Sequence, residues 1–363
     1  MAVQKFASAL QTVDLNEKLQ KENEFFSQKF YLSFSGLSKL IHSPVLFYNK
    51  YILKQREMED ASTTEGKLIH CLLLQPDKFD DEFLVTDEGT ISGKGKQLVD
   101  GLFEYITAGT DNDFWKSVDE ESLPKMSDFD AIILDLTNTL EYFQKMEATA
   151  RVNKIVNDAK LTAYWNNRFQ AMRKTIISRE MLSNASSVVH KIQNNAYLRS
   201  LMGVNSLEMG TNVVSYNEMH MYDELDEEYV FGIHGVIDNL VIDHDSKMIR
   251  VNDLKTTSKD LTRFSDAIEY YDYDLQLAHY TMLILKNPLY KTLIEEQGYQ
   301  LEARFIVVDC YAQVASFKLS QETLDKAIER LVGKYEQANY HLINRDFTLP
   351  YDFIQLENHE MTI

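Results

Sequence analysis

Apolar and polar positions follow two different periods along the chain, and the change falls near residue 210. Before it, apolar residues recur every three to four positions, which is typical of helices, and the segments end at prolines or polar loops. After residue 210 the pattern predicts strands. A polar helix is predicted over 1–30. Further helical segments cover about 33–43, 45–55, 63–74, 97–110 and 127–202, and a loop covers 86–97. The strands cover 211–222, 229–242, 248–255, 304–310 and 313–319, with helices over about 272–285 and 321–339.

This order of elements predicts an α+β (α/β) fold. Three successive strands form a meander, a helix follows, and two more strands complete a mixed sheet that the helices flank. We expect a helical extension over 1–30 and a single domain over 31–345. Within that domain, about 97–202 is a helical insertion and about 210–320 is the core, and 346–363 is a C-terminal tail.

Charge and composition narrow the classes of partner. Among 363 residues, 37 Lys and Arg stand against 56 Asp and Glu, so the net charge is -19. Such a surface repels nucleic acid and anionic membranes except where basic residues gather. The two cysteines are too few for a disulfide framework or a four-cysteine metal site, which fits a cytoplasmic protein. No apolar run approaches the ~18 residues of a membrane span, and the charged N-terminus is unlike a secretory signal.

The candidate chemistry lies in a hairpin over 230–257. If its turn is centred on 245–246, Asp238 and Asp253 each stand seven residues from the centre. They then face each other on adjacent antiparallel strands, with Cβ atoms ~4.5–5.5 Å apart. Lys255, two residues beyond Asp253, projects from the same face of the sheet.

Two opposed carboxylates repel each other, and a divalent cation between them makes the arrangement tolerable. Asp253 also interrupts an otherwise apolar strand, so packing does not explain it. One interpretation is a site for a hard metal ion with an adjacent lysine. The other is a different register, in which both aspartates are solvated residues at strand ends.

Further residues each allow two interpretations. Gln276 and Tyr280 share one helix face and either orient a substrate or lie on the surface. His70 on an apolar helix is either a core residue or a ligand that suits Mn²⁺ better than Mg²⁺. Lys259 and Arg263 place basic charge beside the hairpin, as a phosphate backbone requires. The tyrosines of the segment YYDYDL either stack on bases or pack in the protein.

Taken together, these residues resemble a known family. The pattern joins Gly-x-x-Asp ending at Asp238, Asp-x-Lys ending at Lys255, and Gln-x-x-x-Tyr ending at Tyr280. Upstream stand a Gly-x-x-x-His element ending at His70 and a Ser-x-Ser-x-Leu … Ser-Pro-x-x-Phe-Tyr helix pair ending at Tyr48. This order resembles the PD-(D/E)XK nuclease superfamily in its RecB-like branch. GKLIHCLLLQPDKFDDEFLV and NDLKTTSKDLTRFSDAIEYYDYDLQLAHY are most similar to RecE-like (exonuclease VIII type) phage and prophage exonucleases.

The resemblance implies a restriction-endonuclease-like core and a role for each residue. Asp238, Asp253, His70 and the backbone carbonyl of Leu254 would bind Mg²⁺ or Mn²⁺. Lys255 would orient or deprotonate the attacking water, and Gln276 and Tyr280 would hold the substrate strand. Glu218, in the preceding strand, is a candidate support that no motif covers.

The resemblance also implies a function. It suggests a metal-dependent exonuclease that degrades the 5′-ended strand of linear duplex DNA, assembles as a homo-oligomeric ring and supplies a single-strand annealing protein in phage recombination. A phage-encoded protein would then act in the bacterial host cytoplasm. Two alternatives stay open. One is another RecB-like specificity, either single-strand or endonucleolytic cleavage, and the other is a non-catalytic DNA-binding protein that keeps the fold.

Overall fold

The computed structural model describes residues 15–55, 61–86, 91–107, 122–172, 174–204 and 212–356. Contacts divide these residues into two compact units. One unit comprises the described parts of Met58–Ser187, and the other comprises those of Asp14–Glu57 and Val188–Ile363. We call them the helical unit and the sheet unit.

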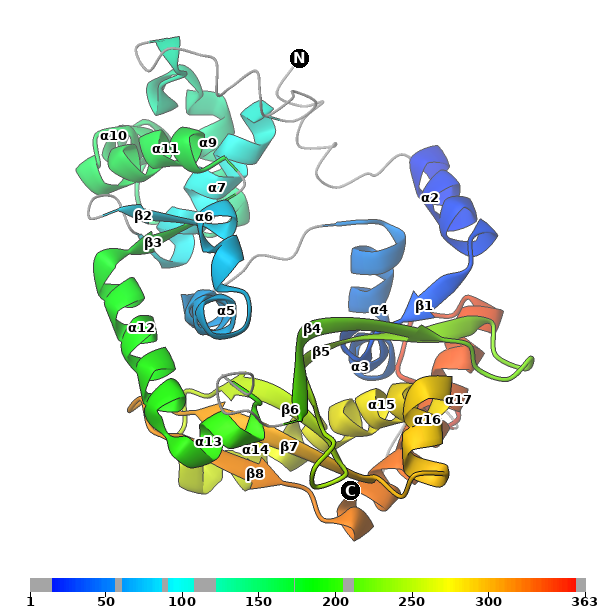
Figure 1. Ribbon diagram of the computed structural model, residues 1–363. Coiled ribbons are helices and arrows are strands. Elements are labelled where there is room, and N and C mark those ends of the chain that lie inside the picture. The colour runs from blue at the N-terminus through cyan, green and yellow to red at the C-terminus, as the bar shows by residue number, and fades with distance from the viewer. Residues whose placement is uncertain are drawn as a thin grey trace. The chain divides into compact units, whose positions relative to one another are not determined.

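The sheet unit is built on one mixed six-stranded sheet (Figure 1). Its strands are β1 (Phe30–Leu32), β4 (Val213–Asp223), β5 (Phe231–Asp243), β6 (Met248–Thr256), β7 (Gln300–Val308) and β8 (Val314–Lys318). The order is β1-β5-β6-β7-β8, and β4 pairs with β5 as well. β1 runs parallel to β5 and β6 parallel to β7, while the remaining pairs are antiparallel. The predicted mixed sheet is therefore confirmed.

Helices flank this sheet. They are α2 (Leu15–Ser27), α3 (Phe34–His42), α4 (Pro44–Phe47), α13 (Ala196–Leu201), α14 (Phe264–Tyr270), α15 (Tyr273–Lys286), α16 (Pro288–Glu295), α17 (Gln321–Asn344) and α18 (Tyr351–Ile354). A π-helix (Tyr48–Ile52) continues α4, and a short 3-10 turn (Leu261–Arg263) precedes α14. α15 lies against β5, β6 and β7 on one side and against α17 on the other (Figure 1).

The hairpin of β5 and β6 has the predicted register. Its pairs run from Asp243↔Met248 next to the turn to Asn239↔Asn252, and each pair is symmetric about residues 245–246. Apolar side chains of both strands are buried in one core with α15, among them Ile237, Leu240, Ile242, Ile249 and Val251. The core includes Leu277 and Leu283 of α15, and each side chain of this size stabilises the fold by about 1.5–3 kcal/mol when it is buried. This core holds the hairpin in place.

The helical unit has its own core. Its elements are α5 (Ala61–Leu74), α6 (Phe79–Glu82), β2 (Phe83–Thr86), α7 (Gly93–Thr107), α9 (Asp130–Thr139), α10 (Ala148–Val156), α11 (Ala159–Ala171), β3 (Thr175–Ser178) and two 3-10 turns, Pro76–Lys78 and Met126–Asp128. Phe103, Trp165 and Phe169 pack their rings together at its centre. The Trp165 indole donates to the carbonyl of Pro124 at 2.7 Å. Helix α12 (Arg179–Asn194) begins in this unit and ends in the sheet unit.

Several short elements differ from the prediction. Strands also occur before residue 210, because β2 and β3 pair in parallel and β1 adds to β5. These runs hold three or four residues, and a run that short cannot be told from a helical segment by its period. α7 starts at Gly93, so part of the predicted loop is helical. Residues 1–14, 87–90, 108–121, 173, 210–211 and 357–363 of the predicted elements and regions lie outside the described residues.

Among the described residues, no helix is both long and apolar enough to cross a bilayer.

A buried histidine fastens α15 to its neighbours. His279 is fully buried; its Nε2 lies 2.9 Å from the carbonyl of His234, and its Nδ1 lies 2.7 Å from the hydroxyl of Tyr335. A carbonyl only accepts, so Nε2 carries the proton and Nδ1 of the neutral ring accepts from Tyr335. Burial lowers the pKa of His279 from 6.5 to about 4. The neutral ring therefore holds α15 to both β5 and α17.

The lowered pKa of His279 predicts a stability that depends on pH. Because the unfolded chain binds this proton more readily, the contribution is fully present above pH 6.5 and is lost as the pH falls towards 4. The stability that His279 contributes at neutral pH, and that is lost over this pH range, is about 3 kcal/mol. In urea titrations, His279→Gln should lower the unfolding free energy at pH 7 and flatten its decline between pH 6.5 and 4. The exposed His190→Gln control should keep that decline. If the unfolding free energy depended on pH equally in both variants, the pH dependence could not be assigned to His279.

Candidate active site

Three carboxylates stand in one row across neighbouring strands. The pairs on either side, Asn217↔Asn239 and Met219↔Ile237, place Glu218 of β4 opposite Asp238 of β5. A carboxylate oxygen of Glu218 and one of Asp238 lie within 4.8 Å of each other. On the other side of Asp238, the ladder with β6 ends at Asn239↔Asn252, and Asp253 occupies the next position. The register therefore gathers the three acids at one place on the sheet.

Glu218 has an unusual backbone conformation. Its φ of 51° lies in the left-handed region, which costs a residue with a side chain about 1–3 kcal/mol. The pairing of β4 with β5 skips Glu218 and resumes at Met219. Such strain persists where the surrounding structure enforces it, often at functional sites. The local sequence shows no turn signal that would have revealed this kink.

Asp253 and Lys255 form a buried pair on β6. Asp253 is 1% exposed, and its Oδ2 lies 2.7 Å from Nζ of Lys255. The same Nζ donates to Oε1 of Gln276 at 2.8 Å. Burial lowers the pKa of Lys255, but the nearby Asp253 and Asp238 carboxylates outweigh it and hold the pKa above its ordinary value. The lysine is thus a fixed positive charge beside the acids.

Asp238 is oriented by the strand opposite. The backbone N–H of Leu254 donates to Oδ2 of Asp238 at 2.7 Å. This hydrogen bond joins β5 to β6 at the position just beyond the ladder. A charged acceptor makes such a bond strong, so it sets the direction in which the carboxylate points.

Gln276 and Tyr280 extend the site along α15. Nε2 of Gln276 donates to the hydroxyl of Tyr280 at 2.9 Å, which confirms that the two share a face. Burial, and then the negative charges of Asp253 and Asp238, raise the pKa of Tyr280 well above its ordinary value. The phenol therefore stays protonated. A continuous chain of contacts links Tyr280 through Gln276 and Lys255 to Asp253.

Gly235, the first residue of the Gly-x-x-Asp element, leaves room for Tyr280 and Leu283 of α15 to lie against β5. A Cβ added at Gly235 would stand 2.8 Å from Cδ1 of Leu283 and 3.0 Å from the ring of Tyr280. Contacts that short force neighbours to move. The glycine is thus required by the close approach of α15 to β5.

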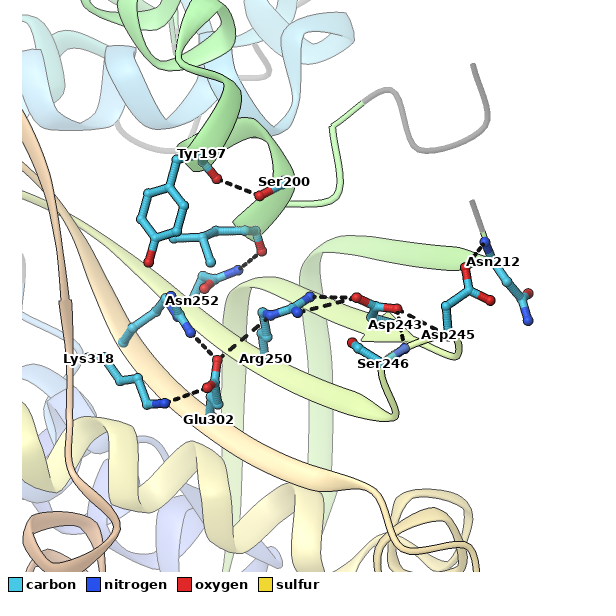
Figure 2. Close-up of polar contacts among 12 residues, drawn as sticks. Tyr197, Ser200, Asn212, Asp243, Asp245, Ser246, Arg250, Asn252, Glu302 and Lys318 are labelled. Carbon is cyan, nitrogen blue, oxygen red and sulfur yellow. Dashed lines mark hydrogen bonds and ion pairs between the residues drawn. The ribbon is translucent and has the colours of Figure 1, made fainter. Parts of the chain in front are cut away.

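The opposite face of the same strands carries a polar layer. Asn239 and Asn252 are buried there, and Nδ2 of Asn252 lies 2.6 Å from Oδ1 of Asn239. Asn252 also donates to the carbonyl of Leu201, and Asn239 donates to that of Met202. Figure 2 shows Asn252 between α13 and an ionic network of Arg250, Asp243 and Glu302. The asparagines therefore hold the end of α13 directly behind the acids.

The remaining predicted residues are placed as follows. His70 lies half-buried on α5 of the helical unit. Lys259 and Arg263 lie in the exposed segment that follows β6, and Arg263 forms an ion pair with Asp266 at 3.3 Å. Sequence reasoning identified Asp238, Asp253, Lys255, Gln276 and Tyr280, which the sheet unit brings together, but it gave no motif for Glu218.

The donor set fits a hard divalent cation. Three carboxylates meet with a single lysine, so the cluster holds more negative than positive charge. Carboxylate oxygens are the ligands that Mg²⁺ and Mn²⁺ prefer. Carboxylate oxygens of Glu218 and Asp238 lie within 4.8 Å of each other, and Asp253 stands at the next position on β6.

Comparison with known proteins identifies the class. The family model of the PD-(D/E)XK nuclease superfamily matches residues 31–345, so the chain belongs to that superfamily. Members are hydrolases that act on nucleic acid and use divalent metals, and the protein is a nuclease of this kind. A search of curated proteins gives no match.

Two solved structures are similar at low identity. One, from Eubacterium rectale and named "Putative exonuclease", has 11% identity and a TM-score of 0.44, and the match covers 92% of this chain and 87% of that one. The other, SSO0001, has 14% identity and a TM-score of 0.21, over 42% of this chain and 67% of that one. Because both TM-scores lie below 0.5, the assignment depends on the family match.

The close approach at Gly235 predicts the effect of one added methyl group. Gly235→Ala should push the Tyr280 ring away from Gln276, lower nuclease activity and destabilise the fold by about 1–3 kcal/mol. Urea unfolding and a hydrolysis assay measure both effects. Gly333→Ala is the matched control, because nothing lies within 4 Å of its added Cβ on α17. Unchanged stability and activity in Gly235→Ala would show that α15 does not need this contact.

Proposed function

We propose that the protein is a metal-dependent DNA exonuclease that degrades linear duplex DNA from its 5′ ends. The observation that supports this proposal best is that Asp238, Asp253 and Lys255 lie close together, with Gln276 in contact with the lysine. These are the residues of the superfamily pattern, and the chain belongs to that superfamily. The polarity and the preference for duplex come from the resemblance to RecE-like exonucleases.

Each residue has a proposed task in phosphodiester hydrolysis. Asp238 and Asp253, with the Leu254 carbonyl and His70, would hold Mg²⁺ or Mn²⁺. A bound divalent ion lowers the pKa of water and neutralises charge on the phosphate oxygens. Lys255 orients the attacking water and stabilises developing negative charge. Gln276 fixes the lysine and, with Tyr280, positions the strand.

Glu218 is the additional acid in this proposal. Its carboxylate lies beside that of Asp238, and its strained backbone keeps it there. We assign it to support of the metal site. This assignment comes from the row of acids across the sheet and from no motif.

The oligomeric state of the protein and its biological pathway are proposed from the resemblance alone. We propose a homo-oligomeric ring that acts in the cytoplasm, in phage recombination, with a single-strand annealing protein as partner. A second candidate is single-strand or endonucleolytic cleavage. A non-catalytic DNA-binding role is disfavoured, because the Lys255–Asp253 pair and the Gln276 contact are in place.

Digestion of linear duplex labelled at the 5′ or the 3′ end tests the proposal. With Mg²⁺ the protein should release 5′ label first, and EDTA should stop the release. Asp253→Asn and Lys255→Met should each reduce the rate at least about 10³-fold, because each removes a charge that the transition state requires.

The exposed Lys326→Met on α17 is the matched control for Lys255→Met and should cleave at the normal rate. Circular dichroism checks that each variant is folded. Wild-type rates in Asp253→Asn or Lys255→Met would refute the site. Release of 3′ label first would refute the polarity, and cleavage of closed circles would favour an endonuclease.

DNA affinity should depend on the basic residues that follow β6. Lys259→Glu combined with Arg263→Glu should weaken DNA binding by about tenfold or more and reduce its dependence on salt, because phosphate contacts release counterions. The loss should be similar for all sequences. Fluorescence anisotropy at several salt concentrations measures both. Lys291→Glu combined with Lys326→Glu, on α16 and α17, is the matched control. Normal binding by the first double variant would place the DNA path elsewhere.

A further inference from the structure

Three tyrosines lead from the catalytic lysine to the surface. Nζ of Lys255 lies 4.8 Å from the ring centre of Tyr273. Tyr273 stacks on Tyr271 with ring centres 5.4 Å apart and planes at 27°. Tyr271 meets Tyr270 edge-to-face at 4.8 Å. The rings thus form a continuous row that begins at the proposed site of hydrolysis.

Exposure rises along this row in a way that core packing does not explain. Tyr273 is half-buried and packs against Phe264 and Phe305 of the core. Tyr271 is 50% exposed and Tyr270 is 77% exposed. The inner ring is anchored, and the outer two present large apolar faces to solvent.

The backbone between the rings is strained and tied down. Asp272 has a φ of 52°, in the left-handed region. Its carboxylate contacts Nε2 of His42 at 2.9 Å and Nη2 of Arg330 at 3.0 Å. The same arginine donates to Asp274 at 2.7 Å. These contacts hold the turn from α14 to α15 in the shape that stacks Tyr271 on Tyr273.

We propose that Tyr270, Tyr271 and Tyr273 form a stacking platform for unpaired bases of the strand whose phosphodiester lies at Lys255. The inference rests on the proposed nuclease function and adds a substrate class, a strand that is single-stranded where it meets the site. Aromatic side chains stack on any base, so the platform binds without sequence preference.

Charge around the platform favours bases over the phosphate backbone. Glu269 of α14 is exposed next to Tyr270 in the chain, and its negative charge repels phosphates there. The faces of the bases are uncharged and meet no such repulsion. The strand therefore lies with its bases on the rings and its phosphates towards Lys255.

Two strands of equal length test the platform. One is oligothymidine, and the other carries the same phosphodiesters with every base replaced by a tetrahydrofuran abasic residue. Tyr270→Ala with Tyr271→Ala should raise KM for oligothymidine about tenfold, the ratio that a loss of ~1.4 kcal/mol of stacking gives. The same variant should cleave the abasic strand as the unchanged protein does. Tyr270→Phe with Tyr271→Phe should restore the normal KM, because the rings are kept.

Tyr197→Ala is the matched control, since this tyrosine is 63% exposed and lies on α13 near the opposite face of the sheet (Figure 2). A second readout needs no cleavage. In EDTA, the fluorescence of a strand that carries 2-aminopurine should be quenched by the unchanged protein and by the Phe variant, and not by the Ala variant.

The outcomes separate the two proposals. An unchanged KM for oligothymidine in the Ala variant, or an equal rise for both strands, refutes the platform and leaves the nuclease assignment intact. If the unchanged protein cleaves neither strand nor duplex, the nuclease proposal fails and the platform fails with it.

Discussion

Electrostatic repulsion among Glu218, Asp238 and Asp253 is the constraint on which the rest of the site depends. Three adjacent strands place these acids in one row, and like charges at such distances disfavour one another. Local contacts offset part of the cost: Lys255 approaches Asp253 to 2.7 Å, and the Leu254 N–H donates to Asp238. A site that gathers negative charge in this way binds a divalent cation favourably. A divalent cation, which nucleases of this superfamily use, would relieve this repulsion if bound between the acids.

The two faces of the sheet support this row in different ways. On one face, α15 brings Gln276 and Tyr280 to Lys255, and it can do so because Gly235 lets the helix approach. On the other face, Asn239 and Asn252 fasten the end of α13. Since side chains alternate along a strand, each asparagine directly neighbours one of these acids in sequence. Both layers therefore limit the movement of β5 and β6 where the acids lie.

The net charge of -19 sets a further condition for a protein that acts on nucleic acid. Phosphates must approach a largely acidic surface, so their attraction has to be local. Lys255 places a positive charge at the candidate site, and Lys259 and Arg263 lie in the segment that follows. Stacking on the tyrosines of the α14–α15 turn would add affinity that does not depend on charge, which suits an acidic nuclease.

The sequence by itself determined the two strands of the hairpin and the polar turn between them, and it offered the observed register as one of two interpretations. Of the two interpretations that the sequence allowed, the structure has the pairing symmetric about residues 245–246, and that pairing places Asp238 beside Asp253 with Lys255 on the same face. The helical period likewise predicted that Gln276 and Tyr280 share one helix face, and a hydrogen bond joins them there. Only the tertiary structure decided the rest. The short strands β1, β2 and β3 exist because a partner strand pairs with them, and their three or four residues carry no period of their own. The left-handed kink at Glu218 and the need for Gly235 arise where β4, β5 and α15 meet, and contacts between segments far apart in sequence leave no local pattern.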